Sequence, residues 1–165
     1  MVEPRRRTQG EDDAPLEGVR VLVVESGYYD DVAGALLAGT RRALDRAGAA
    51  CEVVTVTGAL EIPQAVALML DGAPRGTWAG VVALGCVIRG ETSHYDIVAG
   101  ESARALMDLA VGRGIPIGNG ILTVDTAAQA QVRAAPDGGD KGGAAARAVL
   151  SLMRLQRRLA ARTPT

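Results

Sequence analysis

Four short runs of consecutive apolar residues recur along the chain, separated by segments with helical periodicity. The clearest run is Val81-Val82-Ala83-Leu84, inside an apolar segment that spans residues 79–88. A strand that is apolar on successive residues must be covered on both faces, which is typical of parallel sheets. The alternation therefore predicts an α/β domain in which helices cover both faces of a four-stranded parallel sheet.

The pattern also predicts where each element lies. The expected strands cover residues 19–24, 51–57, 79–88 and 115–124, and the expected helices cover residues 31–47, 62–70, 93–111, 127–134 and 142–161. The final helix places one apolar stripe along its length, made of Ala145, Val149, Leu152, Leu155 and Leu159. We interpret this stripe as the face that packs on the sheet, because no other signal supports the alternative of a helix on a membrane surface.

The length of 165 residues suits one domain. Residues 1–17 are polar, dense in charge and contain two prolines, so we expect a mobile leader there. The single domain is then expected over residues 18–162, with residues 163–165 as a tail.

Composition argues against several classes of partner. The formal charge is -1 and the sequence pI is about 5.8, which favours neither nucleic acid nor an anionic membrane as a partner. No apolar run approaches the roughly twenty residues of a membrane span, and no export signal is visible, so we expect a cytoplasmic protein.

Cys51 and Cys86 each fall in an apolar run, which indicates buried thiols of a reducing compartment. One histidine and two separated cysteines make a metal site improbable.

His94 is the only histidine of the chain, and it follows the third apolar run. Open parallel sheets bind ligands outside the carboxyl ends of their strands, which is where this residue falls. Ser93 and Asp96 match a capping box, which predicts that His94 lies in the first turn of a helix. The positive end of that helix favours the neutral imidazole, which can both accept and return a proton. From this stretch alone, a plain surface histidine is an equal alternative.

Two other features are candidates for anion binding. Gly90-Glu91-Thr92 precedes the helix of His94 and offers backbone N–H groups to a phosphate, although a plain turn explains the segment equally well. Lys141 is the only lysine, which indicates a compact point charge, with drift as the simpler explanation. Arg133 could pair with an acid as readily as with a phosphate. We reject Cys86 as a nucleophile, because buried structural cysteines are far commoner than catalytic ones.

Taken together, the chain resembles the lumazine synthase family over most of residues 18–155. The segments that carry the resemblance are Gly58-Ala-Leu-Glu-Ile-Pro63, Ala83-Leu-Gly-Cys-Val-Ile-Arg-Gly-Glu-Thr-Ser-His-Tyr-Asp96, Pro116-Ile-Gly-Asn-Gly-Ile-Leu-Thr123, Gln129-Ala130 with Arg133, and Lys141-Gly142. Each segment is weak alone, but together they are specific. The resemblance implies a flavodoxin-like three-layer fold. It also implies a cofactor-free condensation of 5-amino-6-ribitylaminouracil with 3,4-dihydroxy-2-butanone 4-phosphate, which yields 6,7-dimethyl-8-ribityllumazine, phosphate and water.

The resemblance implies catalytic roles for His94 in proton transfer and for Arg133 as the phosphate-binding cation. The implied substrate-binding residues are Tyr28 for stacking on the pyrimidine, Ala59, Leu60 and Glu61 for the ribityl chain, Cys86, Val87 and Ile88 for the pyrimidine, and Glu91 and Thr92 for the phosphate. It further implies a homo-oligomer built of pentamers, in which Asn119 and Lys141 approach the pocket of a neighbouring subunit.

Three positions depart from the family pattern. Leu60 and Asn119 stand where aromatic residues are frequent, and Ala144 stands where an acidic residue is common. The departures imply weaker substrate affinity with turnover retained. Two other functions are compatible with the same pocket: a protein that carries a lumazine or flavin without turnover, and a shell or scaffold subunit. His94 and Arg133 favour the enzyme, because neither a carrier nor a scaffold needs a proton carrier beside a phosphate cation.

Overall fold

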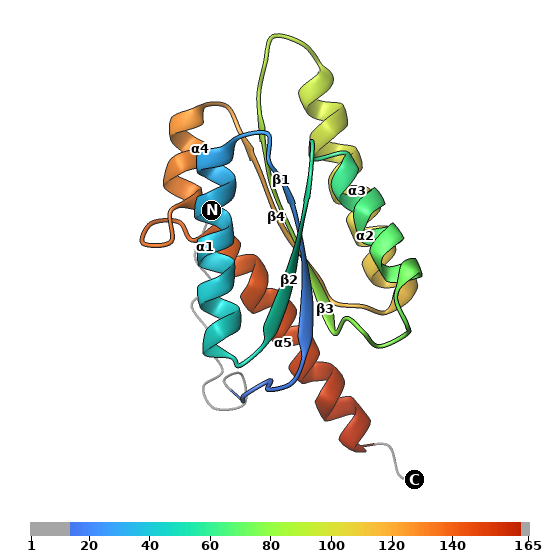
Figure 1. Ribbon diagram of the computed structural model, residues 1–165. Helices are drawn as coiled ribbons and strands as arrows, with labels where there is room; N and C mark the ends of the chain where they lie inside the picture. The colour runs from blue at the N-terminus through green and yellow to red at the C-terminus, as the bar shows by residue number, and fades with distance from the viewer. Residues whose placement is uncertain (1–13, 163–165) are drawn as a thin grey trace.

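The computed structural model describes residues 14–162, and strands alternate with helices along them (Figure 1). The elements in chain order are β1 (Arg20–Ser26), α1 (Asp30–Arg46), β2 (Ala50–Val56), α2 (Glu61–Gly72), β3 (Gly80–Ile88), α3 (His94–Arg113), β4 (Ile117–Val124), α4 (Ala127–Ala134) and α5 (Lys141–Arg162). Each expected element is present. Their ends differ from the expected ones by at most two residues, as where β4 begins at Ile117 and not at Ile115.

The four strands form one parallel sheet in the order β2-β1-β3-β4. In the centre of the sheet Val23 lies opposite Val53 of β2 on one side and opposite Val82 of β3 on the other. The predicted four-stranded parallel sheet is therefore confirmed. β2 pairs with one edge of β1, and β3 pairs with its other edge. The direction in which successive strands join the sheet therefore reverses between β1 and β3. Ligands bind at such a reversal, outside the carboxyl ends of the strands.

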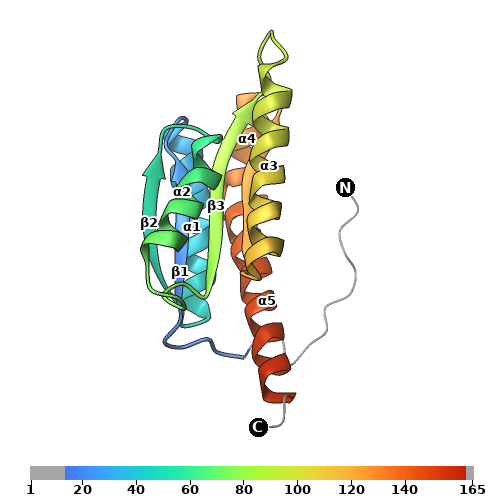
Figure 2. The same cartoon turned by 90° about the vertical axis from the view of Figure 1, so that its right-hand side faces the viewer.

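Helices cover both faces of the sheet, which gives three layers (Figures 1 and 2). Val21 and Val23 of β1 belong to the core under α1, α4 and α5, whereas Leu22 and Val24 belong to the core under α2 and α3. Alternate residues of one strand thus enter opposite cores, which is why the strands are apolar on successive residues. Each fully buried Val or Leu contributes about 1.5–3 kcal/mol to folding.

The final helix corrects one expectation. The buried face of α5 contains Ala145 and Val149, but Leu152, Leu155 and Leu159 are exposed. Leu152 faces away from the core, since its neighbour Met153 is the buried residue of that turn. Leu155 and Leu159 belong to the last turns of α5, which extend past the amino ends of the strands (Figure 1). No helix of residues 14–162 combines the length and the hydropathy that crossing a bilayer requires.

The start of the domain also lies earlier than expected. Leu16 is fully buried in the core under α1, and its N–H donates to the carbonyl of Ala47 at 2.7 Å. Arg154 and Arg157 of α5 donate to the carbonyls of Ala14 and Pro15. A mobile leader up to residue 17 is therefore wrong for residues 14–17, because the apolar Leu16 anchors them. Residues 1–13 and the expected tail of residues 163–165 lie outside the described residues.

Candidate active site

A cavity of about 340 Å³ opens at the carboxyl edge of the sheet, beside the reversal between β1 and β3. The loops after β1, β2 and β3 all contribute to it, and its lining contains the following predicted site residues: Tyr28, Ala59, Leu60, Glu61, Cys86, Val87, Ile88, Thr92 and His94. These residues come from four segments of the sequence. The parallel sheet brings them together because all its strands end at the same edge.

A larger hollow of about 910 Å³ lies at the opposite, amino edge of the sheet. Residues at the starts of strands line it, among them Val19, Ala79 and Pro116. It contains none of the predicted site residues, and its Asp71 and Arg113 side chains already pair with each other at 2.6 Å. The smaller cavity is therefore the better candidate for chemistry, since it holds the only histidine.

His94 is the first residue of α3, so the prediction that it lies in the first turn of a helix is confirmed. The predicted capping box is wrong. Ser93 has helical dihedral angles (φ -70°, ψ 0°) and its side chain caps nothing, whereas a capping side chain normally requires an extended backbone. The hydroxyl of Thr92 instead accepts the N–H of His94 at 3.4 Å.

The imidazole of His94 is exposed at the cavity. Within residues 14–162 it has no hydrogen bond and no ion pair to another side chain. Both ring nitrogens are thus available to a bound molecule, and a ring of this kind can accept a proton and return it.

Two adjacent tyrosines form one wall of the cavity. The rings of Tyr28 and Tyr29 meet edge to face, with centroids 5.0 Å apart and planes at 72°. Tyr28 is 69% exposed, so its ring surface is open to a flat ligand. Burial raises the pKa of Tyr29, and the neighbouring Tyr28 and Cys86 raise it further. Sequence reasoning did not select Tyr29, although a second ring beside Tyr28 in a chain with so few aromatics was a usable signal.

The turn after β2 supplies another part of the cavity lining. Glu61 begins α2, and its N–H donates to the carbonyl of Gly58 at 3.2 Å. A Cβ on Gly58 would stand 2.9 Å from Oε2 of Glu61, so a side chain here would displace this carboxylate from the turn. Ala59 is buried, whereas Leu60 is half-buried. The turn thus presents backbone groups and one carboxylate to the cavity.

Cys86 is buried among the residues that line the cavity. Burial raises the pKa of its thiol to about 11, so the group stays protonated at neutral pH. This agrees with the interpretation of Cys86 as a structural thiol. Cys51 is also free but only half-buried, which corrects the expectation of two buried thiols. In residues 14–162 no three His, Cys, Asp or Glu side chains come together as metal ligands would.

Arg89 anchors the loop that carries Gly90 and Thr92, and no sequence pattern singled this residue out. It follows directly on β3, and its guanidinium lies 4.1 Å from the centroid of the Tyr95 ring. Its Nε donates to Asp125 Oδ1 at 3.1 Å, and its Nη1 lies 3.5 Å from Asp96 Oδ1. Hydrogen bonding to Asp125 raises the pKa of this arginine, so the cation is permanent. One side chain thus links β3, the first turn of α3 and the loop after β4.

Four predicted site residues do not line the cavity of their own chain: Glu91, Asn119, Arg133 and Lys141. Arg133 lies in α4, where its Nη1 donates to the carbonyl of Gln129 at 3.1 Å. Lys141 begins α5. The side chain of Asn119 accepts the N–H of Ile121. Since α4 and α5 cover the other face of the sheet from α3 (Figure 1), one chain does not bring these cations to its own His94.

Comparison with known proteins agrees with this geometry. Residues 18–157 match the family model described as 6,7-dimethyl-8-ribityllumazine synthase. A protein of that name from Methylorubrum extorquens strain PA1 is 55% identical over 95% of both chains. Another from Methylocella silvestris is 58% identical over 94% of this chain and 96% of the relative. A third, 6,7-dimethyl-8-ribityllumazine synthase 1 of Rhizobium meliloti, is 57% identical over 90% of this chain and 98% of the relative. The chain belongs to the 6,7-dimethyl-8-ribityllumazine synthase family.

Proposed function

We propose that this chain condenses 5-amino-6-ribitylaminouracil with 3,4-dihydroxy-2-butanone 4-phosphate, and that the cavity at the carboxyl edge binds both substrates. The observation that carries the proposal is the convergence of His94, the Tyr28 ring and the N–H-rich Gly90 turn on one cavity. The pyrimidine stacks on Tyr28 and contacts the end of β3 at residues 86–88. The ribityl chain lies along residues 59–61.

His94 moves the protons of the reaction. An amine adds to a ketone, water leaves, phosphate is eliminated and a second amine closes the ring, so protons transfer several times between nearly neutral groups. One histidine at hydrogen-bonding distance serves these transfers in turn. Holding two substrates together in one cavity supplies a large part of the remaining acceleration.

The phosphate binds at the turn before α3. Backbone N–H groups at the start of a helix attract an anion, and the hydroxyl of Thr92 adds a donor. Arg133 supplies the permanent positive charge that stabilises the phosphate as it leaves. Glu91 contributes through its backbone, because its carboxylate would repel the anion.

The protein works as a homo-oligomer built of pentamers. Helices α2 and α3 support this, because together they expose four large apolar side chains on one side of the sheet: Leu68, Ile97, Met107 and Val111. Surfaces of this kind are typical of interfaces between subunits. The free thiols and the family's biosynthetic reaction support a cytoplasmic location.

A neighbouring subunit completes the active site. Asn119, Arg133 and Lys141 do not line the cavity of their own chain, and a closed ring of subunits places the same surfaces of every copy in contact with the next copy. Each cavity then combines the His94 of one subunit with the cations of another.

Steady-state formation of the fluorescent lumazine from the two substrates tests the proposed function. The enzyme turns over many times per subunit. A carrier would bind the lumazine tightly and give no turnover, and a scaffold would show neither binding nor turnover. Either of these results would refute the proposal.

A further inference from the structure

Asp140, which immediately precedes Lys141, has two properties that distinguish it from the other acidic residues. Its φ of +45° is the only positive φ of a non-glycine residue in the described part of the chain. Its side chain is also only 17% exposed. A positive φ is uncommon outside glycine, although aspartate adopts it more readily than most residues, and such conformations concentrate at functional sites.

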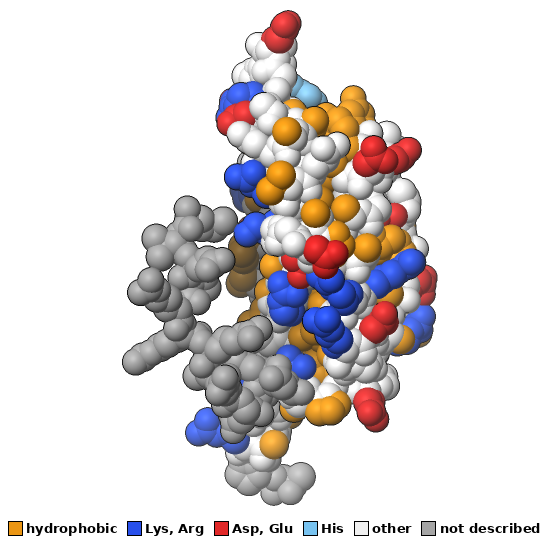
Figure 3. Space-filling model, turned by 90° about the vertical axis from the view of Figure 1, so that its left-hand side faces the viewer, with side chains coloured by type: hydrophobic (Ala, Val, Ile, Leu, Met, Phe, Trp, Pro, Cys, Tyr) orange, Lys and Arg blue, Asp and Glu red, His pale blue; other side chains and the backbone are white. Residues whose placement is uncertain are grey.

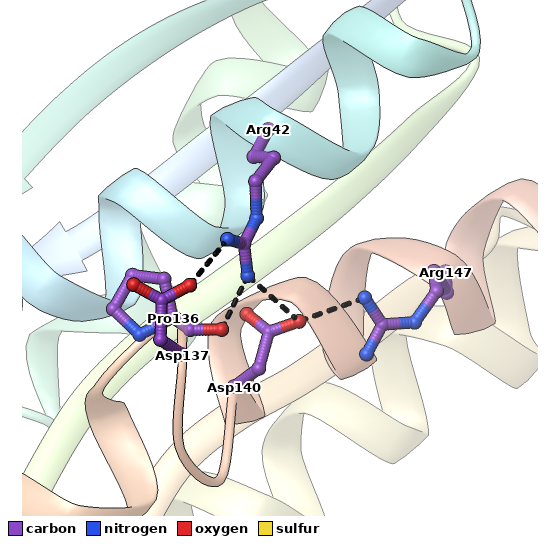
Figure 4. Close-up of polar contacts among 5 residues, drawn as sticks. All are labelled: Arg42, Pro136, Asp137, Asp140 and Arg147. Atoms are coloured by element: carbon purple, nitrogen blue, oxygen red, sulfur yellow. Dashed lines mark hydrogen bonds and ion pairs between the residues drawn. The ribbon is translucent and has the colours of Figure 1, made fainter.

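The surroundings of Asp140 are two arginines from different helices (Figure 4). Its Oδ2 accepts from Nη1 of Arg147 in α5 at 2.9 Å, and it lies 3.7 Å from Nη2 of Arg42 in α1. Arg42 also donates to the carbonyl of Pro136 and to Oδ1 of Asp137. On the side of the molecule that carries α1 and α4, Lys and Arg side chains stand next to Asp and Glu side chains (Figure 3).

Glycines make room for this carboxylate between α1 and α5. A Cβ on Gly39 would overlap Oδ1 of Asp140, and a Cβ on Gly143 would overlap both carboxylate oxygens. Oδ1 is buried and has no hydrogen-bond partner within the described residues. A buried carboxylate with one unsatisfied oxygen costs folding free energy, so it persists only where the rest of the arrangement compensates for that cost.

The same loop is folded tightly onto Arg133. The N–H of Gly139 donates to the carbonyl of Val132 at 2.9 Å, and the N–H of Asp140 donates to the carbonyl of Ala135 at 3.0 Å. A Cβ on Gly139 would stand 2.7 Å from Cα of Arg133. On the other side, the carbonyl of Asp140 accepts the N–H of Ala144 in α5. The end of α4, the loop and the start of α5 therefore form one unit, with Arg133 at one end and Lys141 at the other.

We propose that Asp140 is a positioning residue, which holds Arg133 and Lys141 at a fixed separation so that both cations meet the phosphate of the substrate. The arginines Arg42 and Arg147 anchor it to α1 and α5. The proposal rests on the proposed function, which assigns Arg133 to the phosphate, and it adds Lys141 as a second cation for the same group. It extends that function to a residue that touches no substrate.

Three variants distinguish the loss of the Asp140 side-chain contacts from the effect of the positive φ at this position. Asp140→Gly removes the side chain and still adopts a positive φ without strain. Asp140→Asn keeps an acceptor oxygen and tolerates the same conformation. Asp137→Gly is the matched control: it lies in the same loop and pairs with the same Arg42, but its side chain is 97% exposed.

The decisive measurement is the KM for each substrate. Loss of a partly exposed hydrogen bond between charged groups weakens affinity about fivefold. Asp140→Gly should therefore raise the KM for the butanone phosphate by about that factor. The KM for the pyrimidine should stay within about twofold, and Asp140→Asn and Asp137→Gly should resemble the wild type in both constants. An unchanged KM in Asp140→Gly, an equal rise for both substrates, or an equal rise in Asp137→Gly would overturn the proposal.

Inorganic phosphate titrated by calorimetry gives a second comparison that needs no turnover. Asp140→Gly should bind phosphate about fivefold more weakly than the wild type, and Asp140→Asn should bind it equally well. A wild-type protein that binds phosphate without turnover would refute the proposed function alone. If phosphate affinity were unchanged in Asp140→Gly, or absent in the wild type, the positioning role would be refuted.

Discussion

His94 combines three properties that a proton carrier requires. Its ring lies at the cavity, it forms no hydrogen bond or ion pair with another side chain of residues 14–162, and it stands at the positive end of α3. The last property comes from the backbone, because the aligned peptide dipoles of α3 place a partial positive charge at its first turn. A histidine in this position is poised to exchange protons with a ligand and contributes little to the packing of the fold.

Replacing His94 by alanine should therefore affect chemistry and leave substrate binding nearly intact. Loss of a general acid or base lowers turnover by about 10²–10⁴-fold, and we expect kcat to fall within that range while both KM values change only a few-fold. Steady-state assays of lumazine formation measure both constants. Asp45→Ala, an exposed position in the last turn of α1 and outside the proposed interface, serves as a control for handling and folding. Wild-type turnover in His94→Ala would contradict the role.

Cys86 shows how burial fixes the protonation state of a side chain. Its folded pKa of about 11 lies above the unfolded value of 9.0, so the folded state disfavours the thiolate. The contribution of the thiol to stability is fully present below pH 9 and is lost as the pH rises toward 11. Between pH 8 and pH 10.5 the loss amounts to about 2 kcal/mol of unfolding free energy.

This loss is measurable against a variant without the thiol. Urea unfolding of the wild type and of Cys86→Ala at pH 8 and pH 10.5 gives the stability difference at each pH. We expect the wild type to be the more stable at pH 8, and we expect its advantage to shrink by about 2 kcal/mol at pH 10.5, because only the wild type releases this proton on unfolding. A constant difference would show that burial does not control this thiol.

At the scale of elements, the crossing of α1 and α5 depends on Gly142. A Cβ at this position would overlap the backbone carbonyl of Leu36, which cannot rotate away. Helices approach so closely only where one of them lacks a side chain. This close crossing sets how α5 lies on the sheet and hence where Lys141 begins the helix.

Gly142→Ala should therefore destabilise the fold, in spite of the higher helix propensity of alanine. Forcing a methyl group against backbone costs about 1–3 kcal/mol. Gly34→Ala in α1 is the matched control, because no atom lies within 4 Å of the new methyl group and the substitution should stabilise by about 0.5–1 kcal/mol. Thermal unfolding of both variants compares them. A Gly142→Ala protein as stable as Gly34→Ala would contradict the tight crossing.

The sequence predicts the elements well because their signals are local. A run such as Val81 to Leu84 reports burial on both faces directly, and β3 lies where that run does. Interactions between distant segments leave no such mark. Arg89 pairs with Asp125, and Arg42 pairs with Asp140, although the partners lie far apart in the sequence. No local pattern near either arginine therefore predicts its partner. The capping box at Ser93 failed for the opposite reason, since a local pattern was present but the backbone did not take the angles it needs.

At the scale of the whole molecule, the sheet separates the two halves of the proposed active site. His94 and the tyrosines lie at the cavity at the carboxyl edge, whereas Arg133 and Lys141 belong to the helices on the face of α1 (Figure 1). A phosphate that meets both halves has to bridge two copies of the chain. The exposed apolar side chains of α2 and α3, such as Met107, favour association of copies, because an interface would remove them from water.

Shared sites make a specific prediction for mixed oligomers. His94→Ala chains keep intact cations, and Lys141→Ala chains keep an intact histidine, so each variant alone should have little turnover. Coexpressed in equal amounts, the two chains assemble at random, and a site is intact where a chain with His94 stands before a chain with Lys141. About one site in four meets this condition in a closed ring, so the mixture should recover about a quarter of the wild-type activity.

The mixing experiment needs proof that the chains have mixed. Light scattering gives the mass of the assembly, and two different affinity tags, purified in sequence, isolate particles that contain both variants. Mixed particles with no more activity than the single variants would show that His94 and Lys141 act within one chain. A Lys141→Ala protein with wild-type turnover on its own would show that Lys141 has no role. A double variant, His94→Ala with Lys141→Ala, mixed with wild type is the reference. In this reference mixture a shared site is intact only where two wild-type chains are neighbours, which is again about one site in four. Equal activities in the two mixtures therefore indicate a site shared between neighbours.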